Sequence, residues 1–460
     1  MIDPGDTVQE GEVREVSLKK IGICHYRVGR TDGVSLEIAR RREMLMEMGH
    51  EVLLVSGPVQ DGSDVIIPEL EFDSEEISRI KRNAFGPLVD FSTEQQLMDE
   101  IHRAAARITR QLLDMQGREH FDLLFVHNIF SHGRHIAAAK GFADFLNETK
   151  TACVAVHHDL YSSYGDLYRT PHRHVQAYLD RYVPPSLPGM KHVVINSLDR
   201  ARVAECTGTD VTVLPDILDF NQEPWVRDDF NSDFLQALGV RENDLLLLQA
   251  TRIVERKAVE VAVDFAAVLQ SRLPEFVGKS LYNGKQITEK SRLIILLPGI
   301  VEPASEEYYH RLQAYCVHRN VEARFYGGRT GARRLIHEDG SKQYTLWDSY
   351  VFADMVTYPS IREGWGNQFL EAVFARRPVV LFEYPVFIED IRPEGYGFVS
   401  LGDTYECRKE DGMISVPDDV LETAVDKAVF FLCSPATTEM LSRNFLIGRE
   451  KHGMDVLRET

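Results

Sequence analysis

Short apolar runs bounded by turn residues recur along this chain, and stretches of helical period separate them. In the first 215 residues the runs are IGICHY (21–26), EVLLVSG (51–57), FDLLFVH (121–127), ACVAVHH (152–158), HVVIN (192–196) and VTVLP (211–215). Continuous apolar runs of this length are typical of strands that a parallel sheet buries on both faces. Their alternation with helices predicts an α/β fold, with a doubly wound domain over residues 1–220.

The same alternation starts again after an acidic, strand-poor segment at 216–233. It continues with DLLLLQAT (244–251), RLIILLPG (292–299), VEARFYGG (321–328), ADMVTYPS (353–360) and RPVVLFEY (377–384). We therefore expect a second domain of the same class over residues 221–430. A helical segment at 431–460 is expected to pack back toward the first domain, and the polar stretch 277–291 to form a surface excursion.

Composition narrows the possible partners and the compartment. A net charge of −19 disfavours nucleic acid, because a phosphate backbone would be repelled overall. The six cysteines form no Cys-x-x-Cys pair, which is typical of free thiols in a reducing compartment. The first twenty residues lack an apolar signal core, and no apolar run reaches about eighteen residues. We expect a cytoplasmic protein without a transmembrane segment; its oligomeric state stays open.

The stretch REGWGNQFLEAVFARRPVV (362–380) carries two carboxylates where an apolar helix would be expected to have none. Burying an unpaired charge costs several kcal/mol, so Glu371 either lies on a wet helix face or binds something specific. Gly364 and Gly366 flank Trp365 and precede the predicted helix, which starts at Asn367. The backbone amides there are open to an anion at the helix N-terminus.

Other polar side chains stand at the ends of predicted strands, where ligands of parallel α/β sheets bind. Arg252 follows one strand and Lys257 opens the next helix, and two cations beside a helix N-terminus suit a diphosphate. His157 and His158 end another strand. The loop before Gly33 has the glycines that close backbone approach to a phosphate requires. With Glu363 and Glu371 flanking an anion site, these residues favour a nucleotide sugar as ligand.

Several of these motifs together resemble retaining glycosyltransferases of family 4. The resemblance covers DGVSLEIARRREMLMEMGHEV (32–52), VVINSLDRARVAE (193–205), VTVLPDILDF (211–220), ATRIVERKAVEVA (250–262) and the paired-glutamate stretch EGWGNQFLE (363–371) followed by ARRPVV (375–380). It implies the GT-B fold, in which two Rossmann-like domains face each other across a cleft. The first domain would serve the acceptor and the second the nucleotide diphosphate sugar.

The resemblance also implies roles for individual residues. Glu363 would bind hydroxyls of the donor sugar and Glu371 those of the ribose. Arg252 and Lys257 would hold the diphosphate, the loop at Gly33 would close over it, and His158, with His157 as the alternative, would touch the sugar near the reacting carbon. The donor site would also include Gly364, Trp365, Gly366 and Asn367. The chain departs from the family pattern at Asp32, Ala258, Trp365 and Arg377.

The implied activity is the transfer of a hexose to a hydroxyl of a small, soluble, anionic acceptor, without a metal ion or other cofactor. Arg169, His172 and Arg173 are the candidate acceptor-binding residues, because they form a basic group after the strand-end histidines. Two alternatives remain open: a non-catalytic protein that binds nucleotide sugars, and a metal-dependent hydrolase that uses the histidines of the first domain. Peripheral membrane contact through the amphipathic helix expected near 101–115 also stays open.

Overall fold

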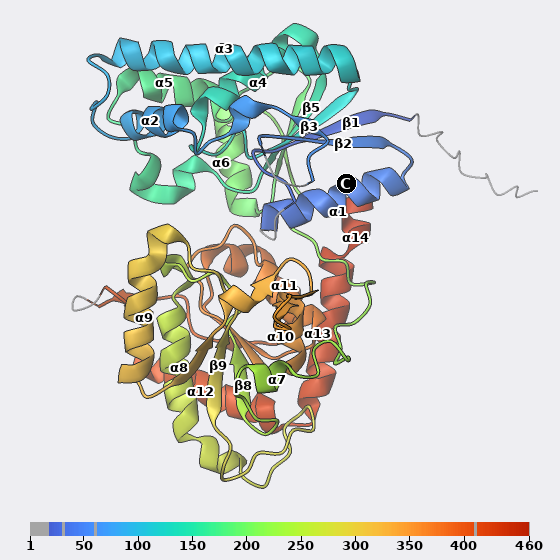
Figure 1. Cartoon of the computed structure of the whole chain (residues 1–460), viewed down its shortest axis with the longest axis vertical. Helices are drawn as coiled ribbons and strands as arrows, with labels where there is room; N and C mark the ends of the chain where they lie inside the picture. The colour runs from blue at the N-terminus through green and yellow to red at the C-terminus, as the bar shows by residue number, and fades with distance from the viewer. Residues whose placement is uncertain (1–17, 30–32, 59–61, 409–411, 460) are drawn as a thin grey trace, which may run out of the picture.

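Two parallel β-sheets organise the chain, one in each half (Figure 1). The computed structural model describes residues 18–29, 33–58, 62–408 and 412–459. The first sheet has the strand order β3-β2-β1-β4-β5-β6-β7, and every neighbouring pair in it is parallel. Its strands are β1 (Lys20–Cys24), β2 (Glu51–Ser56), β3 (Val65–Ile66), β4 (Leu123–His127), β5 (Ala152–His157), β6 (Met190–Val194) and β7 (Val211–Val213). The strand order reverses its direction between β1 and β4, as it does at the switch point of doubly wound folds.

Helices connect these strands and cover the sheet. They are α1 (Gly33–Glu47), α2 (Glu75–Ala84), α3 (Glu94–Glu119), α4 (Ile136–Thr149), α5 (Arg173–Tyr182) and α6 (Ser197–Thr207), with 3₁₀ turns η1 (Pro68–Leu70) and η2 (Tyr161–Tyr168). The apolar face of α3 is fully buried at Ile101, Ile108 and Leu112. This face therefore belongs to the core of the domain. Among the described residues, no helix is long and apolar enough to cross a membrane.

The second sheet has the order β10-β9-β8-β14-β15-β16 and is also parallel. Its strands are β8 (Leu245–Leu248), β9 (Leu293–Leu297), β10 (Glu322–Phe325), β14 (Met355–Tyr358), β15 (Val379–Leu381) and β16 (Val399–Ser400). Two small sheets are added by β11 (Thr330–Gly331), β12 (Leu335–Ile336) and β13 (Lys342–Thr345), and by β17 (Glu406–Cys407) and β18 (Ile414–Ser415). Two Rossmann-like α/β domains are therefore present, which confirms the predicted fold class.

The helices of this half are α7 (Phe234–Ala237), α8 (Val259–Ser271), α9 (Glu306–His318), α10 (Leu346–Phe352), α11 (Asn367–Phe374), α12 (Asp418–Cys433), α13 (Ala436–His452) and α14 (Met454–Glu459). Shorter turns are η3 (Glu255–Lys257), η4 (Leu273–Phe276), η5 (Pro303–Ser305), η6 (Gly327–Arg329), the π-helix η7 (Phe387–Ile391) and η8 (Arg392–Glu394). The excursion at 277–291 folds back on itself through a bridge between Ser280 and Gln286, and it buries Leu281 and Ile287.

The chain connects the two domains a second time at its C-terminus. Met454 and Leu457 of α14 lie in an apolar cluster with Ile21 and Leu54 of the first domain. In Figure 1, α13 rises along the second domain and α14 ends beneath α1. The C-terminal segment thus makes apolar contacts between the two domains, in addition to the chain connection that follows β7.

Alanine substitutions at two helical glycines of the first domain should have opposite effects on stability. A Cβ on Gly141 of α4 would lie 2.8 Å from Cγ2 of Ile108 in α3, whereas a Cβ on Gly117 of α3 would meet nothing within 4 Å. We expect Gly141→Ala to lower the free energy of unfolding by about 1–3 kcal/mol, because the two helices must separate. Gly117→Ala should raise it by up to about 1 kcal/mol, because alanine is the better helix former. Thermal or urea unfolding checks both, and equal midpoints for the two variants would contradict this view of the packing.

Candidate active site

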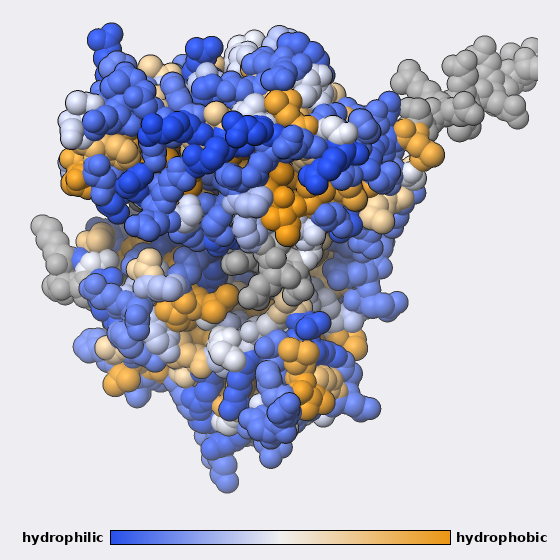
Figure 2. Space-filling view, turned by 45° about the horizontal axis from the view of Figure 1, so that its top comes forward, coloured by the Kyte–Doolittle hydropathy of each residue, from blue (hydrophilic) through white to orange (hydrophobic). Residues whose placement is uncertain are grey.

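The carboxyl ends of the two sheets meet at the boundary between the domains. A Cβ on Gly364, in the loop after β14, would lie 3.0 Å from the carbonyl oxygen of His158, which directly follows β5. The Asn196 side chain of the first domain donates a 3.0 Å hydrogen bond to the Gly364 carbonyl. Figure 2 shows a hollow between the two domains, with hydrophilic residues along the side formed by the first domain. In open α/β sheets this edge is where ligands bind.

A compact charge cluster lies on the second-domain side. Glu363 accepts hydrogen bonds from Nζ of Lys257 and, at 2.9 Å, from Nη1 of Arg256. Burial lowers the pKa of Lys257 to about 8, against the opposing effect of Glu363. Burial acts to raise the pKa of Glu363, but the charges of Lys257 and Arg256 outweigh it and hold that pKa at about 2. The cluster therefore carries one negative and two positive charges at neutral pH.

The turn that presents Lys257 is strained at the next residue. Ala258 has φ = 44°, in the left-handed region that favours glycine. The family pattern commonly has glycine at this position, so the backbone conformation is kept although the residue differs. Arg252 is half-exposed and pairs with Glu302, and its charge helps to lower the pKa of Lys257. Both predicted cations thus lie in one neighbourhood, with Arg256 as a third.

Glu371 lies in the apolar helix α11, where the sequence left open whether its carboxylate is on a wet face or binds a specific partner. Glu371 is buried, and it accepts a 2.7 Å hydrogen bond from the hydroxyl of Tyr350. Burial raises its pKa to about 7, while the bond from Tyr350 and the charge of Arg40 in α1 act in the opposite direction. Glu371 is therefore on a dry face with a specific partner, and it faces a cation of the first domain.

The loop before α11 is closely packed at Gly366. A Cβ there would lie 2.6 Å from the hydroxyl oxygen of Tyr384 and 3.0 Å from Cδ1 of Ile391, so a larger residue would force these side chains to shift. Trp365 is buried, and its ring lies edge-on to His452 of α13, with centroids 5.4 Å apart. The structure places Trp365 in the packing between this loop and α13.

On the first-domain side the central residue is His158. Its Nδ1 lies 3.5 Å from Oδ1 of Asp216, and its Nε2 lies 2.9 Å from Nδ1 of His127. The other oxygen of Asp216 accepts a 3.0 Å hydrogen bond from Asn367, the first residue of α11. Burial acts to lower the pKa of His158, but the hydrogen bond and charge of Asp216 raise it overall. His157 instead pairs with His192, at 3.0 Å, inside the first domain.

Glu37 of α1 completes this buried group. Its Oε2 lies 3.5 Å from Nδ1 of His127 and 3.8 Å from Nε2 of His158, a spacing at which the three residues could hold a metal ion. The other oxygen of Glu37 pairs with Arg41. Burial and the proximity of His158 lower the pKa of His127 well below its usual value.

Gly33 begins α1 at the same boundary. A Cβ there would lie 2.8 Å from the side-chain nitrogen of Asn367, so the N-termini of α1 and α11 meet across the two domains. Residues 30–32, which belong to the predicted phosphate loop, lie outside the described residues. The described part of the loop is thus positioned next to the donor-site residues named from the sequence.

The three predicted acceptor residues lie in the first domain between the end of η2 and the start of α5. His172 hydrogen-bonds with the Gly86 carbonyl at 2.8 Å, and Arg173 opens α5 with an exposed side chain. Arg169 is exposed one residue after η2. The backbone N–H of His172 donates to the hydroxyl of Thr170, so the described contacts of His172 do not join it to the Asp216–His158 group. A role for these three residues in acceptor binding stays a prediction.

Sequence pattern did not point to Arg256, Asp216, Tyr350 or Glu37, whereas His127 is one of the first-domain histidines considered for the metal-dependent alternative. Arg256 directly precedes Lys257, and Asp216 follows a strand, so position alone could have selected these two.

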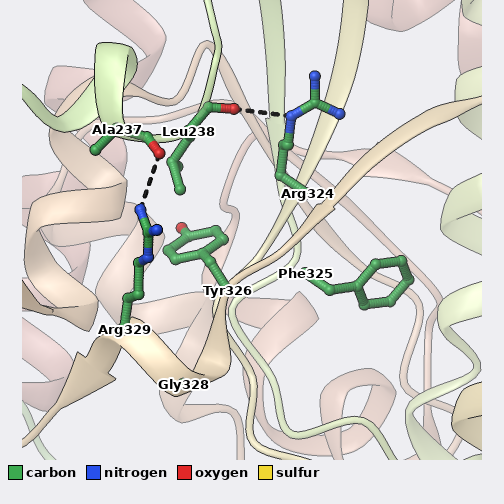
Figure 3. A pocket seen from close by; sticks show the side chains of 7 residues that line it. All are labelled: Ala237, Leu238, Arg324, Phe325, Tyr326, Gly328 and Arg329. Atoms are coloured by element: carbon green, nitrogen blue, oxygen red, sulfur yellow. Dashed lines mark hydrogen bonds between the residues drawn. The ribbon is translucent and has the colours of Figure 1, made fainter.

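A shallow pocket of about 330 Å³ lies apart from the site, at the edge strand β10 (Figure 3). There Arg324 and Arg329 donate to the carbonyls of Leu238 and Ala237.

Two curated proteins match almost the whole chain. The chain is 36% identical over 443 residues to the mannosylglucosylglycerate synthase of Petrotoga mobilis, covering 96% of this chain and 100% of that protein. It is 34% identical over 442 residues to the synthase of the same name from Thermotoga maritima, covering 96% and 98%. The chain belongs to this glycosyltransferase family. No family model matches the chain.

Solved structures agree on the fold of this glycosyltransferase. The sucrose-phosphate synthase of Thermosynechococcus elongatus superposes with a TM-score of 0.59 at 13% identity, over 96% of this chain and 97% of that one. The Anabaena protein HepE, in complex with UDP and glucose, gives 0.58 at 14% identity over 96% and 97%. The resemblance to retaining glycosyltransferases of family 4, the GT-B fold and the assignment as a hexosyltransferase are therefore confirmed.

The lowered pKa of Lys257 predicts how activity depends on pH. As the pH rises through about 8, Lys257 loses the charge that we expect to face the donor diphosphate. We expect kcat/KM for the donor to fall with an apparent pKa near 8, and kcat to fall at higher pH because a bound diphosphate raises the lysine pKa. Lys257→Arg should have lower turnover but no such limb, since a guanidinium stays protonated. An alkaline limb unchanged in this variant would assign the titration to another group.

Proposed function

We propose that this protein transfers a mannosyl group from a nucleoside diphosphate mannose to a hydroxyl of glucosylglycerate, with retention of anomeric configuration and without a divalent metal. The observation that carries the proposal is the identity of 36% with a mannosylglucosylglycerate synthase along that protein's entire length. The product named there contains a mannosyl group on a small carboxylate-bearing glycoside. That agrees with the small, anionic acceptor expected from the sequence.

The charge cluster of the second domain would bind the donor. Arg252, Arg256 and Lys257 would stabilise the charge that develops on the departing diphosphate, which is commonly the largest contribution to catalysis. The open amides around Gly364 and Gly366 at the start of α11 would add hydrogen bonds to the same phosphates. Glu363, which holds the cations in place before the donor arrives, would then accept hydrogen bonds from hydroxyls of the donor sugar.

Glu371 and His158 would bind the two ends of the donor. Glu371 would accept hydrogen bonds from the ribose hydroxyls, with Tyr350 orienting the carboxylate. His158 would donate a hydrogen bond near the reacting carbon, because the Asp216 carboxylate favours the protonated imidazole. Asp216 would also fix the orientation of the ring, while its contact with Asn367 aligns the histidine with the donor helix.

The cluster of Glu37, His127 and His158 supports a second reading, in which a metal ion takes part. The geometry favours the metal-free reading, because His127 and His158 use for their mutual hydrogen bond the same nitrogens that a metal would need. Glu37 is also neutralised by Arg41. A non-catalytic sugar-nucleotide binder would have no need to keep all of these charged groups. All six cysteines are free thiols, which suits the cytoplasmic location proposed here.

Product analysis tests the proposed reaction. We expect purified protein to transfer mannose from one member of a panel of nucleoside diphosphate sugars to glucosylglycerate, and NMR of the product from an α-linked donor to show an α-linkage. Turnover should persist in the presence of a chelator. A β-linked product would refute retention, loss of turnover in chelator that added metal restores would support the metal reading, and binding of the donor without turnover on any acceptor would support the non-catalytic alternative.

The two glutamates should separate nucleotide binding from turnover. We expect Glu371→Gln to weaken nucleoside diphosphate binding on the order of 10-fold or more, because ribose contacts are present in donor and product alike. Glu363→Gln should leave that affinity unchanged or stronger, since it removes a negative charge beside the phosphates, but lower turnover on the order of 10²-fold. Tyr350→Phe is the matched control that keeps the Glu371 carboxylate. Calorimetry and initial rates check these expectations, and equal loss of diphosphate affinity in both glutamate variants would refute the division of roles.

A further inference from the structure

A second polar group lies beside His158 at the carboxyl edge of the first sheet. It begins at His25, directly after β1, whose Nδ1 lies 3.0 Å from the carbonyl oxygen of His127. His25 acts electrostatically on His132 in the loop after β4, and Nδ1 of His132 lies 3.4 Å from the hydroxyl of Tyr168 after β5. The loops that follow β1, β4 and β5 thus place this group next to the histidine pair of the active site.

Arg134 is the exposed cation of this group, and aromatic side chains hold it. Its guanidinium lies 5.2 Å from the centre of the Phe72 ring, and its charge acts to lower the pKa of Tyr168 against the effect of burial. The Tyr168 ring packs against Gly133, where a Cβ would lie 2.5 Å from the ring. The side chain therefore has a defined position without a carboxylate partner: among the described residues, no aspartate or glutamate forms an ion pair with Arg134.

Two cations act on His132, against the opposing charge of Asp159, although the chain carries −19 overall. Lys81, exposed in the last turn of α2, acts on His132 together with Arg134, and the described residues include no ion pair to Lys81 either. Arg27, which covers the same Phe72 ring, is in contrast neutralised by Glu71 and Asp73. Among the described residues, therefore, Arg134 and Lys81 have no acidic ion-pair partner and remain available to an anion.

Burial keeps His132 neutral next to these cations. Burial lowers the pKa of His132 to about 4, and Arg134 and Lys81 act in the same direction against Asp159. The backbone N–H of Arg134 donates to Nδ1 of His132 at 3.2 Å, so Nδ1 is the acceptor and the ring proton lies on Nε2. His132 therefore adds no charge of its own and orients the loop that carries Arg134.

We propose that Arg134 binds the carboxylate of the acceptor, and that Tyr168, whose ring packs against Gly133, positions the loop that carries the guanidinium. This inference rests on the proposed function. A glycerate carboxylate is separated from the hydroxyls of its sugar by the glycosidic linkage, so an acceptor with its sugar at His158 would extend along the strand ends toward Arg134. The planar fork of a guanidinium matches a carboxylate in two parallel hydrogen bonds.

Matched acceptors test the carboxylate directly. Rates are measured with glucosylglycerate and with glucosylglycerol, its neutral counterpart. We expect Arg134→Gln to raise KM for glucosylglycerate on the order of 10²-fold while KM for the donor and the rate on glucosylglycerol stay within about 2-fold. Arg134→Lys should recover part of the loss, and Tyr168→Phe should show a smaller increase in KM for the anionic acceptor only.

Arg181→Gln is the matched control, because it removes an exposed arginine of the same domain, in the last turn of α5, to which no binding role is assigned. It should change KM for glucosylglycerate by less than about 2-fold. Equal losses of Arg134→Gln on the anionic and neutral acceptors would overturn the proposal, since they would indicate a structural role. A selective loss in Arg173→Gln or Arg169→Gln but not in Arg134→Gln would overturn it as well, and would place the carboxylate at the other loop.

A binding measurement separates this inference from the proposed reaction. Calorimetry with glycerate, in the presence of a nucleoside diphosphate, requires no turnover. Binding to the unaltered protein that Arg134→Gln abolishes would support the carboxylate site even if glucosylglycerate proved not to be a substrate. Equal binding to both proteins, or binding to neither, would overturn it while leaving the transferase assay to decide the proposed function.

Discussion

A buried carboxylate, Asp216, joins the two domains at the candidate active site. It accepts a hydrogen bond from Asn367 of the second domain and lies 3.5 Å from His158 of the first. A buried acid that loses its partners costs several kcal/mol, so an arrangement of the domains that separates them is penalised. The N-terminus of α11 and the strand-end histidine are therefore held side by side. The rest of the candidate active site is arranged around that contact.

The second domain also buries charged side chains, and it stabilises them by pairing them with one another. Lys257 and Arg256 share the carboxylate of Glu363, so three charges that burial would destabilise separately satisfy one another. In the proposed reaction a donor diphosphate would take over the cations, and Glu363 would turn to sugar hydroxyls. Dipoles and charges already in place at the reacting bond need little reorganisation, which is the usual source of electrostatic catalysis. The first domain would use a related principle, with Arg134 held by aromatic rings until an acceptor carboxylate arrives.

Much of the fold and part of the site could be predicted from local sequence pattern. The apolar runs predicted the main strands of both sheets, and the glutamate pair predicted where charge would concentrate. The pattern did not show that Glu371 would be buried against Tyr350, because the two residues lie on different helices. Asp216 lies in the acidic, strand-poor segment 216–233 between the two predicted domains, and the composition of that segment does not indicate burial. The backbone strain at Ala258 was likewise invisible, although the departure from glycine marked the position.

The sequence by itself determined two α/β domains and a row of charged side chains at their strand ends. Periodicity and apolar character are local properties of the chain, so the amino-acid sequence alone is enough to recognise them. Only the tertiary structure decided which histidine faces the second domain, which carboxylate joins the domains, and which arginine lies against the Phe72 ring near the histidine pair. Asn367 and Asp216, for example, are 151 positions apart. Contacts of this kind depend on how the two finished sheets dock, and no short-range pattern encodes the docking of surfaces that far apart in the chain.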